Sequence, residues 1–202
     1  MPHAIFVETG LDAGSTVAAY AAELPGCAVF ASSDAEAVGA MPRRVAGFTA
    51  WLRSSGEAAP TFIGDNWYEV ERGAVRGTPK VPERVTFSLD ELPPSAAEFG
   101  SYLGWLELAR EELAAALDAA GGAPTKALAG IVRQDLASAV LLGSAAPGAA
   151  PSDPIDRLYV ARDHLTEALE RAGPTADGVR RIVRLAIADD LRVAERLRES
   201  PR

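Results

Sequence analysis

Four segments in the second half of the chain repeat apolar residues at alternating steps of three and four. They cover residues from about 95–120, 125–142, 154–172 and 176–199. This spacing gathers the apolar residues on one face of a helix, as in the seam of a helical bundle. The longest break, "GSAAPGAAPSDP", lies between the second and third segments, and Asp153 and Pro154 are suited to begin the third helix. We therefore expect an all-α four-helix bundle with one long crossover.

Each of the four stripes contains a charged residue where an apolar residue is expected. In chain order these residues are Arg110, Asp135, Arg162 and Asp189. A buried charge without a partner costs several kcal/mol, and the planar fork of an arginine can bridge two carboxylates. We predict that these four residues form a buried ion-pair network in the bundle core. The alternative is that one or more of them lies at the edge of its stripe, in water.

Residues 1–91 are expected to form a separate α+β domain, and residues 92–202 the bundle. The predicted sheet is small and antiparallel and is accompanied by one helix. "AIFVET" and "STVAAYAA" are strand-like and flank "GLDAG", which is typical of a hairpin connection. Further strands are predicted at "CAVFAS", at "NWYEVER" (66–72) and at "RVTFSL" (84–89).

The helix of this first domain is predicted to begin after Asp34 as its N-cap and to run to Leu52. Pro42 lies inside it and is expected to kink or restart the helix, because proline removes a backbone hydrogen bond. Gly56 is suited to end it.

The composition argues against several classes of function. A net charge of −8 argues against non-specific nucleic-acid binding, and no apolar run is long enough to span a membrane. The one cysteine, Cys27, permits no intrachain disulfide, and the two histidines, His3 and His164, are far apart in the chain. His164 is expected at the surface. No nucleotide-binding, metalloprotease or serine-hydrolase motif is present. We expect a cytoplasmic protein that binds no cofactor and is not an enzyme.

The stretch "ELPGCAVFASSDAEAVGAMPRRVAGFTAWLRSSGE", 23–57, resembles the HicB-type antitoxin fold, a partial RNase H-like fold. The residues in matching places are Pro25, Gly26, Cys27, Asp34, Glu36 and Ala37. The resemblance implies a small sheet with one helix, and a HicA-like toxin as partner. Members of this family use a separate segment to bind DNA, and the bundle stands in its place here. A protein partner, or a homodimer formed through this domain, is a further expectation.

The second half, over roughly 95–199, resembles a DinB-like bundle through "DLASAV" (135–140) and "ADDLRVAERL" (188–197). In that family three histidines hold a divalent metal ion. Asp135, Asp189 and Val193 stand at the three histidine positions, and Val140 and Asp190 at the two acid positions. The resemblance therefore implies a degenerate metal site, in which none of the three histidines is retained.

Three functions remain open. The first is a non-enzymatic interaction or regulatory protein built from the two modules. The second is a metal-dependent DinB-like enzyme, a thiol transferase or hydrolase, in which Asp135 and Asp189 hold Mg²⁺ or Mn²⁺ together with waters. The third is an antitoxin that binds a HicA-like toxin.

A small apolar ligand is also conceivable, in a pocket between the two halves. The aromatic residues that would line it are Trp67, Tyr68, Tyr102 and Trp105. The alternative interpretation is that these side chains only pack the two halves together.

Overall fold

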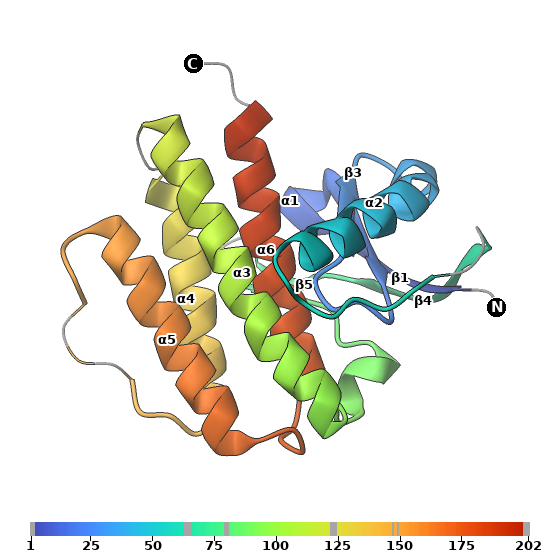
Figure 1. Cartoon of the computed structure of the whole chain (residues 1–202). Helices are drawn as coiled ribbons and strands as arrows, with labels where there is room; N and C mark the ends of the chain where they lie inside the picture. Colours follow the sequence, from blue (N-terminus) through green and yellow to red (C-terminus); the bar gives the residue numbers. More distant parts are fainter. Residues whose placement is uncertain are drawn as a thin grey trace. The chain divides into compact units, whose positions relative to one another are not determined.

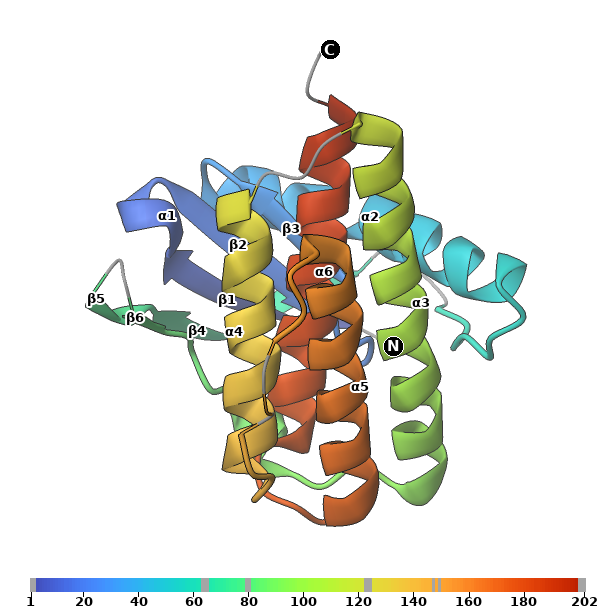
Figure 2. The same ribbon diagram turned by 90° about the vertical axis from the view of Figure 1, so that its left-hand side faces the viewer.

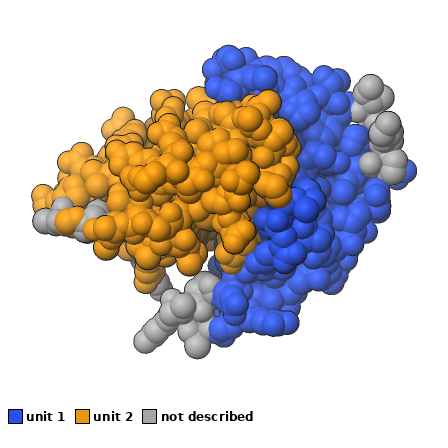
Figure 3. Space-filling model, turned by 90° about the horizontal axis from the view of Figure 1, so that it is seen from below, with its two compact units in different colours: residues 1–92 blue, residues 93–202 orange. Residues whose placement is uncertain are grey.

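The computed structural model describes residues 3–62, 66–78, 81–121, 125–146, 148 and 150–199. It divides into two compact units, unit 1 from Met1 to Leu92 and unit 2 from Pro93 to Arg202, which Figure 3 colours separately. An α+β unit is followed by a helical unit, as the sequence predicts. Within the described ranges, no helix combines the length and the apolar character needed to cross a lipid bilayer.

The sheet of unit 1 has four strands in the order β3-β2-β1-β4 (Figure 1). They are β1 (His3–Gly10), β2 (Thr16–Ala21), β3 (Ala28–Ala31) and β4 (Trp67–Ala74). The pairs β1–β2 and β2–β3 are antiparallel, whereas β1–β4 is parallel. The prediction of an antiparallel sheet is therefore wrong at β4. A helix separates β3 from β4, and a crossover of this kind brings the chain back in the same direction.

That helix, α2, spans Asp34–Ser54 and packs against β2, β3 and β4. Its N-cap is Ser33, whose side chain accepts a hydrogen bond from the Glu36 N–H, so the prediction of Asp34 as N-cap is wrong by one residue. Pro42 lies inside one continuous helix, so of the predicted kink or restart the restart is wrong and the kink stays a prediction. Packing of its buried face stabilises the helix although proline removes one backbone hydrogen bond. The buried residues are Ala37, Met41, Val45, Phe48, Thr49 and Leu52.

The segment "RVTFSL" is not a strand, and this prediction is also wrong. A two-stranded ribbon of β5 (Arg76–Thr78) and β6 (Val81–Glu83) precedes it, and its last two residues begin a short 3-10 helix, η1 (Ser88–Glu91). Residues 84–91 contact the sheet at β1 and β4, and we call them the strap. Phe87 of the strap stacks on Phe6 of β1 with ring centroids 4.7 Å apart. The strap contacts two of the four consecutive buried residues of β1, Phe6 and Glu8.

Unit 2 consists of α3 (Ala96–Ala120), α4 (Thr125–Leu141), α5 (Pro154–Ala172) and α6 (Val179–Glu199). Asp153 caps α5 with Pro154 in its first turn, as predicted. A capping box begins α3, in which the side chains of Ser95 and Glu98 each accept a hydrogen bond from the backbone N–H of the other residue. The α3 and α6 pair and the α4 and α5 pair are in contact along their lengths (Figure 2).

The long connection between α4 and α5 makes these two helices run in the same direction. Ser144, just after α4, accepts a hydrogen bond from Arg171 near the end of α5. In the same way, Glu98 and Arg180 pair near the starts of α3 and α6. The first turns of α4 and α5 therefore lie at the same end of the bundle. This is the one long crossover that the sequence predicts.

We predict that Gly73→Ala destabilises unit 1, because Val85 of the strap packs closely against β4 at this residue. A Cβ on Gly73 would lie 2.9 Å from Cγ2 of Val85, and overpacking of this kind costs about 1–3 kcal/mol. Urea denaturation measures the loss. Adding Val85→Ala should restore part of it. Gly47→Ala is the matched control: this exposed residue of α2 has open space around its Cβ position, so alanine should stabilise by about 0.5–1 kcal/mol. Equal effects of the two glycine substitutions would contradict the close approach of the strap.

Candidate functional site

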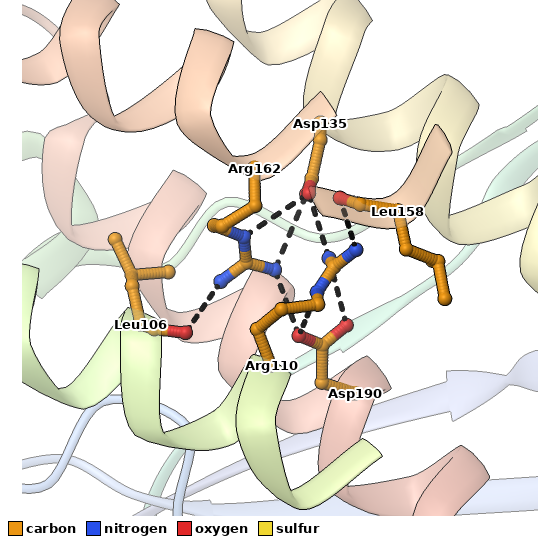
Figure 4. A network of polar contacts seen from close by, with 6 residues as sticks. All are labelled: Leu106, Arg110, Asp135, Leu158, Arg162 and Asp190. Carbon is orange, nitrogen blue, oxygen red and sulfur yellow. Dashed lines mark hydrogen bonds and ion pairs between the residues drawn. The ribbon is translucent and has the colours of Figure 1, made fainter. Parts of the chain in front are cut away.

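Two arginines and two aspartates meet in the interior of unit 2, and each helix supplies one of them (Figure 4). The four residues are Arg110 of α3, Asp135 of α4, Arg162 of α5 and Asp190 of α6, and each is at most 2% exposed. We call this set the Arg–Asp core. It lies beside an apolar cluster of the same four helices, which contains Leu113, Leu117, Leu128, Ile131 and Leu158.

Each guanidinium of the Arg–Asp core contacts both carboxylates. Arg110 donates through Nη2 to Oδ2 of Asp135 at 2.7 Å, and through Nε to Oδ2 of Asp190 at 3.1 Å. Arg162 donates through Nε to Oδ2 of Asp135 at 3.1 Å, and through Nη2 to Oδ2 of Asp190 at 2.9 Å. The outer oxygens are also engaged, Oδ1 of Asp190 by Arg110 at 3.2 Å and Oδ1 of Asp135 by Arg162 at 3.4 Å.

The remaining guanidinium nitrogens reach helix carbonyls. Nη1 of Arg110 donates to the carbonyl of Leu158 at 2.8 Å, and Nη1 of Arg162 donates to the carbonyl of Leu106 at 3.1 Å. These bonds tie each arginine to the backbone of another helix of the bundle. A buried guanidinium is tolerable only when its donors are satisfied in this way.

The structure brings Arg110, Asp135 and Arg162 together, but the fourth member is Asp190 and not Asp189. The prediction of Asp189 is therefore wrong by one residue. Steps of three and four from Ala186 reach Asp189 and Asp190 respectively, so both fit the spacing. The choice is not decided by the apolar pattern because α6 is buried on several faces, with every residue from Ile182 to Ala188 inside. Asp189 is only partly buried.

The electrostatics of the Arg–Asp core are balanced, with two positive and two negative groups. Burial acts to lower the pKa of Arg162, but Asp135 and Asp190 outweigh it and the pKa is raised. Burial raises the pKa of the Asp190 carboxyl, opposed by the charges of Arg162 and Arg110 and assisted by the nearby Asp135. The core is thus a charge-neutral cluster that depends on all four groups.

The residues at the predicted degenerate metal site do not form a set of free ligands. Val193 packs against the apolar cluster and has no donor atom. Asp135 already accepts hydrogen bonds from both arginines. Over the described ranges, no group of three or more His, Cys, Asp or Glu side chains is arranged to hold a metal ion.

The two histidines lie outside the Arg–Asp core. Nε2 of His164 lies 2.9 Å from the carbonyl oxygen of Ala145, and the His164 side chain is half-buried. His3 contacts the rings of Phe62 and Trp67 in unit 1. Cys27 is fully buried.

A second buried ion pair, in unit 1, was not predicted from the sequence. Glu8 of β1 is fully buried and accepts hydrogen bonds from three groups of the sheet and the strap. Arg84 donates to it through Nε at 3.0 Å and Nη2 at 2.9 Å, the Tyr20 hydroxyl at 2.8 Å and the Val85 N–H at 2.7 Å. The signal in the sequence was the position of Glu8 two residues after Phe6, on one face of the strand.

The four aromatic residues predicted to line a pocket belong to different units. Trp67 and Tyr68 are in β4 of unit 1, and Tyr102 and Trp105 are in α3 of unit 2. Tyr102 accepts a hydrogen bond from Arg180, and burial raises the pKa of the Tyr102 hydroxyl to about 12. A pocket shared by all four stays a prediction.

Comparisons of the chain with protein-family models, with curated proteins and with solved structures give no match in any of the three. The resemblances to HicB-type antitoxins and to DinB-like bundles therefore stay predictions. The fold and the two buried ion-pair clusters rest on the structure of this chain alone.

We predict that Asp190→Asn destabilises unit 2 by about 3–5 kcal/mol, because it leaves two buried guanidiniums with one carboxylate. The matched control is Asp189→Asn, at the neighbouring and partly buried residue, for which we expect less than about 1 kcal/mol. Urea denaturation of both variants measures the difference. A larger loss from Asp189→Asn would contradict the assignment of Asp190 to the core.

We predict that the stability contributed by Glu8 disappears in acid. Burial acts to raise the pKa of Glu8, but Arg84, the Val85 N–H and Tyr20 together hold it below the ordinary value of 4.5. A lowered pKa in the folded state means that the contribution is present above about pH 4.5 and is lost as the pH falls through the folded pKa.

The measurement is the free energy of unfolding of the wild-type chain and of Glu8→Gln between pH 7 and pH 3. At pH 7 the variant should be less stable by about 3 kcal/mol, since Arg84 loses its charged partner. The difference should shrink below about pH 4.5. Glu23→Gln, at an exposed carboxylate, serves as the control and should show little difference at any pH. A difference for Glu8→Gln that does not change with pH would refute the role of the charged carboxylate.

Proposed function

We propose that this chain is a non-enzymatic binding or regulatory protein, in which a HicB-like α+β module precedes a DinB-like bundle without a metal site. The observation that carries the proposal is the Arg–Asp core. All four carboxylate oxygens of Asp135 and Asp190 accept hydrogen bonds from guanidinium groups. These carboxylates act as structural partners of arginine.

A divalent cation in this place would have to displace the arginines. Two buried guanidiniums would then face the cation, and only two carboxylates would offset four positive charges. Buried charges of one sign without partners cost several kcal/mol. The charge count therefore favours the ion-pair network over a metal centre at this position.

The burial of these carboxylates argues against general acid–base catalysis, because a substrate has no access to them. A catalytic acid or base must come within hydrogen-bond reach of its substrate. Asp135 and Asp190 are at most 1% exposed, and the guanidiniums of Arg110 and Arg162 occupy the positions around them. In this proposal the core stabilises the bundle, and the recognition surfaces lie on the outer faces of the helices.

The experiment that tests the proposal is metal analysis of the untagged full chain. The protein is dialysed against a chelator, incubated separately with Zn²⁺, Ni²⁺, Mn²⁺ and Mg²⁺, dialysed again and examined by elemental mass spectrometry. We expect no stoichiometric ion. Thermal unfolding gives an independent readout, because a metal at a hundredfold excess over its Kd would add about 2.7 kcal/mol of stability. We expect no such increase.

Substitutions identify where any retained ion is bound. One ion per chain that is lost in Asp135→Asn would contradict the proposal and favour a metal-dependent enzyme with a carboxylate site. An ion that persists in Asp135→Asn and is lost in His3→Ala would lie in unit 1 and leave the metal-free core intact. The partial exposure of His3 makes it the suitable comparison residue.

A further inference from the structure

An open groove lies on the outer side of the bundle, between the first half of α4 and the first turn of α5 (Figure 2 shows these two helices side by side). Its volume is about 350 Å³. Ligand pockets of proteins commonly range over about 300–1,000 Å³, so the groove suits a small ligand. The lining residues are Leu128, Ala129, Val132, Arg133, Leu136, Pro154 and Arg157.

The wall of the groove is an apolar track along α4. Leu128, Val132 and Leu136 follow one another at steps of four and so lie on one side of the helix. At 1.5 Å per residue this track is about 12 Å long. Pro154 of α5 bounds the groove on the other side, and the small, exposed side chain of Ala129 does not narrow it. This shape fits a narrow apolar body better than a flat protein surface.

Two exposed arginines, one from each helix, border the same groove. Arg133 has no hydrogen bond or ion pair with any other residue in the described part of the chain. Arg157 donates only to the carbonyl of Ser152, at 2.6 Å, and pairs with none of the described carboxylates. Other surface arginines of this chain do pair, such as Arg72 with Glu69 and Arg198 with Glu112.

Among the described residues, the acids near this end of α5 form no ion pair with Arg133 or Arg157. Oδ1 of Asp153 accepts hydrogen bonds from the Ile155 and Asp156 N–H groups at 2.8 and 3.1 Å. Asp156 is about 200° around the helix from Pro154 and about 100° from Arg157, and it is not among the residues that line the groove. Because α4 and α5 begin at the same end of the bundle, the positive ends of both helix dipoles also lie here.

We propose that this groove binds a small amphiphilic carboxylate. Its apolar chain lies along Leu128, Val132 and Leu136, and its carboxylate is held by Arg133 and Arg157. An arginine fork matches the geometry of a carboxylate. An apolar track beside two guanidiniums that pair with none of the described carboxylates selects a molecule with both properties. The inference goes beyond the proposed function and does not depend on the metal-free core, since the groove and the Arg–Asp core share no residue.

The test is a titration of the full chain with octanoate, followed by calorimetry and by NMR shifts of the α4 and α5 amides. Octanol, which has the same chain without the charge, is the comparison ligand. We expect octanoate to bind more tightly than octanol. Each charge-assisted hydrogen bond contributes about 1.5–3 kcal/mol, so Arg133→Ala with Arg157→Ala should weaken octanoate by at least about tenfold. Binding of octanol should be unchanged in this variant.

Two matched pairs of variants locate the site. Ala129→Phe fills the groove from an exposed position and should abolish binding, whereas Ala137→Phe, on the same helix outside the groove, should not. Arg43→Ala removes an exposed arginine of α2 in unit 1 and should leave the affinity for octanoate unchanged.

Three results would overturn the proposal. They are no binding of octanoate, equal affinity for octanoate and octanol, and equal affinity of the wild-type chain and the double arginine variant. Loss of binding in Ala137→Phe as well as in Ala129→Phe would also overturn it, because the site would then lie elsewhere. None of these results bears on metal binding, so this proposal and the proposed function fail separately.

Discussion

Two guanidiniums and two carboxylates occupy the interior of the bundle, and each of its four helices supplies one of them. Removing these groups from water is costly, and the cost is offset only while every charge keeps its partners. A helix that slid or rotated would strand a buried charge. The Arg–Asp core therefore favours one register of the four helices, which apolar packing alone would specify less sharply. The carbonyls of Leu106 and Leu158 extend this constraint to the backbone.

The same physics operates once more in unit 1, at smaller scale. Glu8 is buried in the central strand pair and is stabilised by Arg84 from the strap, 76 residues later in the chain. That contact, with the stacking of Phe87 on Phe6 and the close approach of Val85 to Gly73, turns an irregular segment into a cover for the sheet. In both units a buried carboxylate specifies where a distant part of the chain must lie.

The proposed roles of the bundle separate its inside from its outside. Inside, carboxylates that are saturated by arginine favour a structural function over metal chemistry. Outside, Arg133 and Arg157 border an apolar groove and pair with no carboxylate in the part of the chain that the structure describes, unlike Arg72 and Arg198. Recognition of an anionic, partly apolar ligand on the surface is thus compatible with an inert core.

Sequence periodicity by itself determined the four helices of unit 2, the start of α5 at Asp153 and Pro154, and the inward direction of Arg110, Asp135 and Arg162. Local patterns suffice there because helix hydrogen bonds join near neighbours and the apolar face repeats with the turn. Only the tertiary structure decided between Asp189 and Asp190, because α6 is buried on several faces and its pattern marks no single one. It also decided the parallel β4, the strap and the Glu8 cluster, since these depend on contacts between residues far apart in the chain.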